Sequence, residues 1–154
     1  MKEIKEEKTH EVKETITYYE AIDGTRFHCQ DECIKYENSA RGILRAKLKK
    51  LEVWRGNEWD LLKGNDDCAV IALKLTSQKD VDVVMQAFLI DNPYYLKGDE
   101  RAQQWLADRQ AMADRALKEK DLLLMGLNCE DELYFIDTRN ALIERLNNVG
   151  KKQS

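Results

Sequence analysis

Polar and apolar residues near the start of the chain alternate in a way that predicts a β-hairpin. Residues 15–22 are rich in β-branched and aromatic side chains, and they alternate roughly between apolar and polar, as half-buried strands do. Asp23-Gly24 follows, and this dipeptide is a strong hairpin signal because glycine adopts positive φ at no steric cost. Residues 25–27 are then expected to form the returning strand.

The next pattern predicts one long helix over residues 30–55. Asp31 and Glu32 lie in its expected first turn, where the helix dipole favours acidic groups. Apolar residues then recur at steps of three and four, which predicts a single buried stripe along about six turns. The stripe consists of Cys33, Tyr36, Ala40, Ile43, Leu44, Leu48 and Leu51. Gly56-Asn57 is expected to end the helix.

The remaining elements are predicted from short apolar runs and from helix start and stop signals. Strands are expected at residues 58–62, 68–75, 122–127 and 133–136. Helices are expected after Ser77 up to Asn92-Pro93, from Asp99 to about residue 118, and from Asp137 or Thr138 to Gly150. Ser77 and Asp99 are typical N-cap residues, and Pro93 disfavours helix at the residue before it.

This order of elements predicts an α+β fold. Strand pairs that are adjacent in the sequence favour a mostly antiparallel sheet of about four to six strands, with the helices packed mainly on one face. Residues 14–150 are expected to form a single domain. Residues 1–13 balance their charges without an apolar face, so we expect a flexible N-terminal arm. Residues 151–154 are expected to be a polar tail.

Composition narrows the cellular setting. The longest apolar runs are far shorter than the roughly 20 residues of a membrane span, and the first residues lack the apolar core of a secretion signal. We therefore expect a cytoplasmic protein with reduced thiols at its four cysteines. The net charge of −4 argues against a nucleic-acid binder that uses its whole surface.

The densest group of reactive side chains is His28-Cys29 with Cys33. A structural zinc site needs four ligands, commonly in two closely spaced pairs, but Cys68 and Cys129 are single and distant in the sequence. A thiol nucleophile needs an imidazole facing it and a third group that orients the imidazole, and neighbours on a strand point to opposite faces. Packing is the stronger interpretation, with Cys33 in the core stripe of the helix and Cys29 at the helix start, so no metal is expected here.

Two acidic groups in the sequence make a metal-dependent, nuclease-like enzyme an alternative function. Asp66-Asp67 and residues 130–132 could supply carboxylates to a shared metal ion. Both groups lie in predicted turns, where acids are usually solvated, and the sequence leaves open whether they converge. The seven glycines are scattered and match no phosphate-binding fingerprint, so no cofactor is expected. No catalytic residue is assigned.

Two further patterns suggest binding surfaces. Arg41, Arg45 and Lys49 could line a polar face of the predicted 30–55 helix and contact phosphates, which would indicate a nucleic-acid-associated protein. A solvated face opposite the apolar stripe explains them as well. Several aromatic residues lie outside the core stripes and are candidate protein-binding anchors. They are Trp54, Trp59, Tyr94 and Tyr95. Trp105 instead follows the core stripe of its helix.

Residues 16–37 resemble a pattern found in small proteins encoded by bacteriophages and prophages. The matching residues are Tyr18-Tyr19, Asp23-Gly24, Phe27, Glu32-Cys33 and Tyr36-Glu37. The pattern covers about a seventh of the chain and describes a hairpin that leads into a helix. The resemblance implies a phage or mobile-element origin and expression inside a bacterial host, and it transfers no active site.

These observations favour a non-enzymatic protein-binding accessory factor. Its expected partner is a host or phage protein in the bacterial cytoplasm, with no membrane involved. The nucleic-acid and metal-enzyme hypotheses remain as alternatives. A homodimer through an edge strand or through residues 94–96 is also left open.

Overall fold

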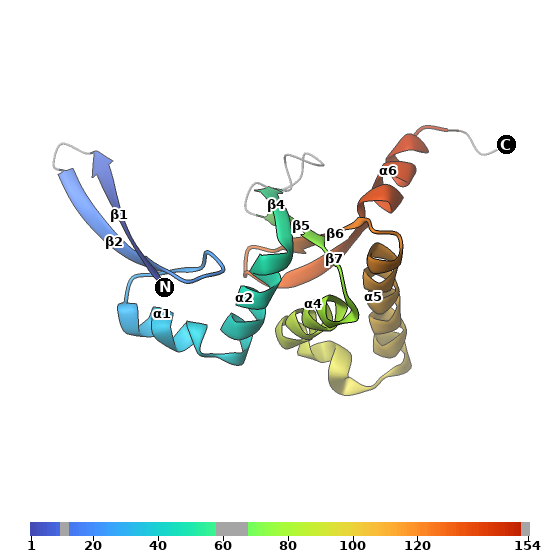
Figure 1. Ribbon diagram of the computed structural model, residues 1–154, viewed down its shortest axis with the longest axis horizontal. Helices are drawn as coiled ribbons and strands as arrows, with labels where there is room; N and C mark the ends of the chain where they lie inside the picture. Colours follow the sequence, from blue (N-terminus) through green and yellow to red (C-terminus); the bar gives the residue numbers. More distant parts are fainter. Residues whose placement is uncertain (10–12, 58–67, 152–154) are drawn as a thin grey trace. The chain divides into compact units, whose positions relative to one another are not determined.

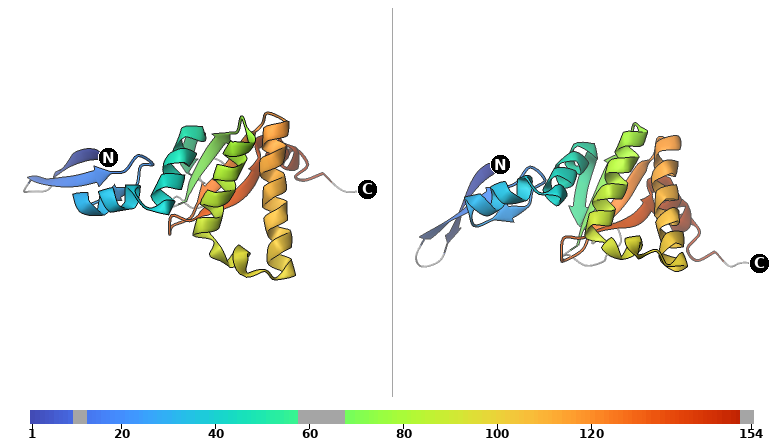
Figure 2. Two further views of the ribbon diagram at one scale, coloured as in Figure 1. Left: turned by 60° about the horizontal axis from the view of Figure 1, so that its bottom comes forward. Right: turned by 90° about the horizontal axis from the view of Figure 1, so that it is seen from below.

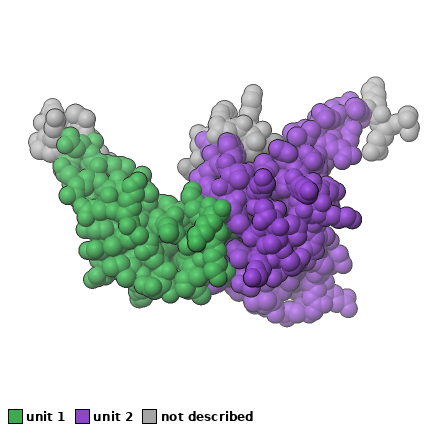
Figure 3. All heavy atoms as spheres, in the orientation of Figure 1, with its two compact units in different colours: residues 1–50 green, residues 51–154 purple. Residues whose placement is uncertain are grey.

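The computed structural model describes residues 1–9, 13–57 and 68–151. The predicted α+β fold with antiparallel strand pairing is confirmed. The chain divides into two compact units, residues 1–50 and residues 51–154, which Figure 3 colours separately. The single domain expected over residues 14–150 stays a prediction. The described strands accordingly form two sheets, one of three strands and one of four.

The first unit contains the three-stranded sheet, with strand order β1-β2-β3 (Figure 1). Its strands are β1 (Lys2–Thr9), β2 (Lys13–Glu20) and β3 (Arg26–Phe27). β1 pairs with β2 from Lys2↔Glu20 to Thr9↔Lys13, so the flexible arm predicted for residues 1–13 is corrected to a strand over Lys2–Thr9. The reason is that backbone hydrogen bonds and cross-strand pairs hold this ladder, whereas our prediction required an apolar face.

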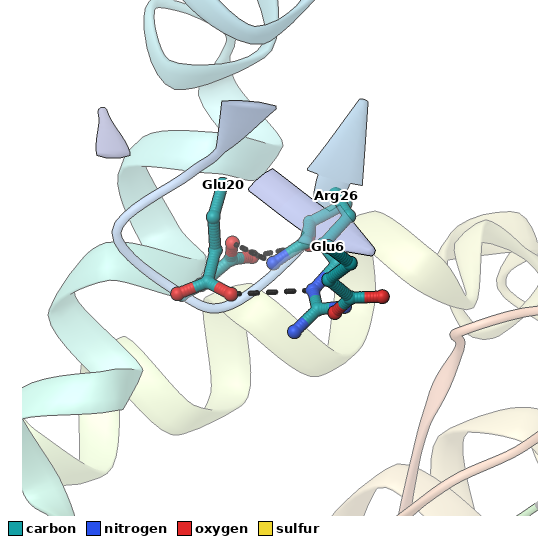
Figure 4. A network of polar contacts seen from close by, with 5 residues as sticks. Glu6, Glu20 and Arg26 are labelled. Atoms are coloured by element: carbon teal, nitrogen blue, oxygen red, sulfur yellow. Dashed lines mark hydrogen bonds and ion pairs between the residues drawn. The ribbon is translucent and has the colours of Figure 1, made fainter. Parts of the chain in front are cut away.

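Arg26 connects all three strands of this sheet through ion pairs (Figure 4). Its Nη1 donates to Glu6 on β1 at 2.6 Å, and its Nε donates to Glu20 on β2 at 3.3 Å. The Glu6 hydrogen bond is the largest cause that raises the pKa of Arg26. Because all three groups are partly exposed, the network adds little to the free energy of unfolding.

The single helix predicted over residues 30–55 is wrong. The structure has two helices, α1 (Gln30–Glu37) and α2 (Ala40–Leu51), followed directly by the strand β4 (Glu52–Asn57). Asn38 Nδ2 donates to the Ile34 carbonyl at 2.9 Å, and Ser39 Oγ accepts from the Gly42 amide at 3.0 Å. These polar side chains satisfy backbone groups at the two new helix ends, which a continuous helix would have paired internally.

The second unit contains the four-stranded sheet, in the sequential order β4-β5-β6-β7. β5 (Ala69–Lys74), β6 (Leu122–Leu127) and β7 (Leu133–Thr138) match the predicted strands. α4 (Gln78–Asp91) and α5 (Glu100–Lys118) lie between β5 and β6 in the sequence and are joined by the short 3-10 helix η1 (Pro93–Lys97). α6 (Arg139–Asn147) follows β7. The predicted strand at 58–62 lies outside the described residues.

The core of the second unit lies between the sheet and its helices. Figures 1 and 2 show α4 and α5 side by side on one face of the four-stranded sheet. The predicted core face of α4 is confirmed, because Val81, Val84, Met85 and Phe88 are all buried. They pack with the apolar strand residues Val70, Ile71, Leu73, Leu123, Met125 and Leu133, which are also buried.

Candidate protein interface

The connection between α4 and α5 is held firmly at both ends. α4 ends at Asp91, as Asn92-Pro93 predicted, and Asn92 Nδ2 donates to the Leu133 carbonyl of β7 at 2.8 Å. The Asp91 carboxylate accepts from the Leu133 amide at 2.9 Å. At the other end, Asp99 Oδ1 accepts from the Ala102 amide at 2.7 Å and caps α5, as predicted. η1 is therefore a rigid element that tethers its side chains to the sheet and to both helices.

Aromatic rings lead from the core to the surface at this connection. Phe88 is buried, and its ring centre lies 5.0 Å from that of Phe135 and 5.1 Å from that of Tyr95. The Tyr95 ring in turn lies 6.4 Å from that of Trp105 and 5.9 Å from that of Tyr94. Such spacings are typical of interacting aromatic pairs. The surface rings thus rest on the core and need little ordering before they bind a partner.

Two large side chains of η1 are exposed to solvent. The side chain of Tyr94 is 44% exposed, and its hydroxyl donates to Asp99 Oδ2 at 3.3 Å. Leu96 is 66% exposed. Large apolar side chains at this exposure, next to rigid aromatic residues, are typical of anchors in protein interfaces.

Two arginines of α5 flank Trp105 at helical spacing. The guanidinium carbon of Arg101 lies 4.6 Å from the centre of the Trp105 ring, which is close enough for a cation–π interaction. The guanidinium carbon of Arg109 lies 5.7 Å from the centre of the Tyr95 ring, and its Nη1 donates to the Trp105 carbonyl at 3.3 Å. We call these two arginines with Tyr94, Tyr95, Leu96 and Trp105 the aromatic platform.

The platform carries positive charge that nearby carboxylates do not neutralise. Within the described part of the chain, neither Arg101 nor Arg109 forms an ion pair with a carboxylate. Arg109 Nε is buried and has no hydrogen-bond partner among the described residues. An unpaired donor of this kind is costly in a free protein. Arg101 is exposed and can pair with a carboxylate on a bound partner, whereas the buried Nε of Arg109 cannot be reached from the surface.

The structure brings together only some of the predicted protein-binding residues. Tyr94 and Tyr95 are neighbours on η1. Trp54 is 41% exposed on β4, which Figure 1 shows well apart from η1. Trp59 lies outside the described residues. Leu96 belongs to the connector at residues 94–96, which we left open as a homodimer contact. We did not predict Arg101 or Arg109, although two arginines at four-residue steps on either side of Trp105 were a readable signal.

The predicted nucleic-acid face is not an exposed stripe. Arg45 is buried, Arg41 is half-buried, and only Lys49 of the three is exposed. Ile43, which we placed on the buried face, is exposed instead. The break at residues 38 and 39 changes the rotation of α2 relative to α1, so one stripe no longer continues through both helices. A buried guanidinium is poorly placed to contact a phosphate backbone.

The other reactive groups do not form a chemical site in the described residues. No group of three metal-ligating side chains was found there. The His28 ring packs against Tyr18 with centroids 5.1 Å apart, Cys29 is exposed, and Cys33 is buried. Burial raises the pKa of the Cys33 thiol, which disfavours the reactive thiolate. Asp66-Asp67 lie outside the described residues.

The acidic turn between β6 and β7 is organised by Asn128. Its side-chain oxygen accepts from the amides of Glu130 and Glu132 at 3.0 and 2.9 Å. Its amide nitrogen also donates to the Glu132 carboxylate. These hydrogen bonds are those of a side chain that shapes a loop. Of the acidic side chains in this turn, that of Glu132 therefore takes part in the turn itself.

Comparison with known proteins adds no family assignment. The chain matches no protein-family model, and no curated protein or solved structure is significantly similar to it. In the described segments, no helix combines the length and apolar character that crossing a membrane would require.

Proposed function

We propose that the protein is a non-enzymatic binding factor, encoded by a phage or mobile element, that acts on a host protein in the bacterial cytoplasm. The aromatic platform is the observation that carries this proposal. It combines tyrosine, tryptophan and arginine, the residue types enriched in binding hot spots. The resemblance of residues 16–37 to phage-encoded proteins supports the proposed origin in a phage or mobile element and the bacterial host.

The platform specifies the chemistry of the partner surface. Tyr94 and Leu96 need an apolar socket, because their exposed surface gains free energy only when it is removed from water. Arg101 and Arg109 need carboxylates at the border of that socket, because they lack acidic partners among the described residues of the chain itself. The proposed partner is therefore a protein with an apolar pocket bordered by Asp or Glu side chains.

Site-specific photo-crosslinking tests this proposal in living bacteria. Leu96 is replaced by p-benzoylphenylalanine, and a matched control carries the same group at the exposed Lys118 of α5. We expect a discrete adduct from position 96 and none of the same mass from position 118. Adding Arg101→Glu should abolish the adduct because it reverses a contacting charge. Adding Arg115→Glu, also exposed on α5, should leave the adduct unchanged.

The affinity for the crosslinked protein is then measured with purified proteins. The crosslinked protein is identified, and its Kd for the native chain and for Tyr94→Ala and Leu96→Ala variants is determined by calorimetry. Each anchor substitution should weaken binding by about 2 kcal/mol, which is typical of hot-spot residues. The proposal is overturned if positions 96 and 118 give the same adducts, or if Arg101→Glu leaves the adduct unchanged.

A further inference from the structure

A second feature of unit 2 is a cavity of about 310 Å³ at the end of the four-stranded sheet. It is lined by Lys74 and Leu75 at the end of β5, Thr76 before α4, Leu117 in the last turn of α5, and Lys120 before β6. Its volume is at the lower end of the range of small-molecule sites, roughly 300–1,000 Å³. Because two connections that are distant in the sequence, β5–α4 and α5–β6, meet here, the cavity is built by the tertiary fold.

The two lysines bring positive charge to this cavity that the neighbouring carboxylates do not neutralise. In the described residues, neither Lys74 nor Lys120 forms an ion pair or a side-chain hydrogen bond. Asp80 Oδ2 already accepts from the Thr76 amide at 2.8 Å, from Thr76 Oγ1 at 3.0 Å and from the Ser77 amide at 3.1 Å.

The second neighbouring carboxylate, Asp121, is engaged as well. It accepts from the amides of Leu122 and Asn140, both at 2.8 Å, and it forms an ion pair with Arg139 at 3.3 Å. Lys74 and Lys120 are exposed side chains that line one cavity, so a bound anion would face both ammonium groups.

Lys120 occupies a backbone position that folding alone would give to glycine. Its φ is +52°, in the left-handed region. Its amide donates to the Leu117 carbonyl and the Asp121 amide donates to the Ala116 carbonyl, the paired bonds that end many helices. Glycine is the usual residue at such a position. Lys120 thus places an ammonium group at the cavity from a strained, left-handed backbone position.

Leu75 and Leu117 add an apolar wall to the charged cavity. Leu75 is buried and Leu117 is half-buried, and both line the cavity. The geometry points to a binding site for a small phosphomonoester with an apolar body. A phosphomonoester carries a charge of about −1.5 to −2 at pH 7, which matches two ammonium groups. This site is separate from the aromatic platform, and its test does not depend on the proposed protein partner.

Titration of the whole chain by two-dimensional ¹H–¹⁵N NMR tests the site. The probes are phenyl phosphate, inorganic phosphate and phenol, which separate the charge from the apolar body. We expect phenyl phosphate to shift the amide signals of Lys74, Thr76 and Lys120 saturably, inorganic phosphate to shift them with a weaker Kd, and phenol to have no comparable effect. Lys74→Gln and Lys120→Gln should each weaken phenyl phosphate binding by about fivefold or more.

Two further variants separate binding from folding. Lys118→Gln removes an exposed lysine at the end of the same helix and should change the Kd by less than about twofold. Lys120→Gly removes the ammonium group while it relieves the left-handed backbone, so thermal stability should rise while binding weakens. The proposal is overturned if phenyl phosphate causes no saturable shift, or if the shifts persist unchanged in Lys74→Gln and Lys120→Gln.

Discussion

The Tyr36 hydroxyl donates a hydrogen bond of 2.7 Å to the Asp23 carboxylate, so the hairpin turn and the first helix are joined by a polar contact. The same carboxylate accepts from the Thr25 amide at 3.0 Å and from the Thr25 hydroxyl at 3.1 Å. Burial, followed by the Asp23 hydrogen bond, raises the pKa of Tyr36 to about 12. Asp23 therefore has two roles, since it shapes its own turn and positions α1.

This contact predicts a stability loss at alkaline pH that depends on Tyr36. Because the folded-state pKa is raised from 10 to about 12, the stabilisation is complete below pH 10 and is lost as pH rises from 10 through 12. Tyr36 is half-buried, so screening limits the loss to about 1–2 kcal/mol. Urea unfolding should show Tyr36→Phe less stable by about 1 kcal/mol at pH 8, with the difference vanishing or reversing by pH 12.

Tyr94→Phe is the matched control for that experiment. It removes the hydroxyl of an exposed tyrosine whose bond to Asp99 is longer, at 3.3 Å. Its unfolding free energy should follow the native chain at every pH. A constant difference between the native chain and Tyr36→Phe from pH 8 to pH 12 would contradict the raised pKa.

Arg109→Met is expected to separate stability from binding. Methionine keeps the length and apolar stem of the side chain, but it removes a buried Nε that has no partner among the described residues. The free energy of unfolding should stay unchanged or rise by about 1 kcal/mol, while the crosslink from position 96 weakens. Arg115→Met, on the exposed surface of α5, should change neither quantity. A large loss of stability in Arg109→Met would indicate a structural role only.

Replacing Gly42 or Gly126 by alanine adds one methyl group, and we expect the two substitutions to lower the free energy of unfolding by different amounts. A Cβ at Gly42 would lie 2.0 Å from the backbone carbonyl oxygen of Tyr36, whereas a Cβ at Gly126 would lie 1.9 Å from the ring of Tyr134. A ring can rotate away, but a helix carbonyl cannot. Gly126→Ala should lower the free energy of unfolding by about 1–3 kcal/mol, and Gly42→Ala should lower it by more.

A double variant checks this explanation at the sheet. Gly126 and Tyr134 are cross-strand partners on β6 and β7. If the Tyr134 ring causes the cost, Gly126→Ala should be nearly neutral in a Tyr134→Ala background. If urea unfolding shows that Gly126→Ala lowers the free energy of unfolding equally in the native chain and in Tyr134→Ala, a clash with the Tyr134 ring is ruled out.

We expect Asp121 to stabilise the last helix, α6, locally. α6 has no buried residue, and the Asp121 carboxylate accepts from its Asn140 amide at 2.8 Å. Asp121→Ala leaves two part-buried amides without their acceptor, so amide hydrogen exchange in α6 should accelerate about tenfold while β6 stays protected. Arg139→Gln removes only the exposed end of the ion pair and should have a small effect. Equal acceleration in α6 and β6 would instead indicate global destabilisation.

The parts of the fold that were predictable from the sequence are those with local signals. Ser77 and Asp99 cap their helices as expected, Asn92-Pro93 ends α4, and the apolar runs of β5 and β6 form strands. Each of these depends on neighbours within about four residues along the chain. The break at Asn38 and Ser39 was missed because the apolar spacing of residues 33–51 continues through it, although both residues are poor helix formers.

The sequence by itself determined the secondary structure around strong caps and turns, the α+β class, and two aromatic residues of the platform. Only the tertiary structure decided that the strands divide between two sheets, that Arg45 is buried while Ile43 is exposed, and that Arg101 and Arg109 stack on rings beside η1. The reason is physical. Caps and turns depend on local backbone hydrogen bonds, whereas burial and charge pairing depend on residues that are distant in the sequence.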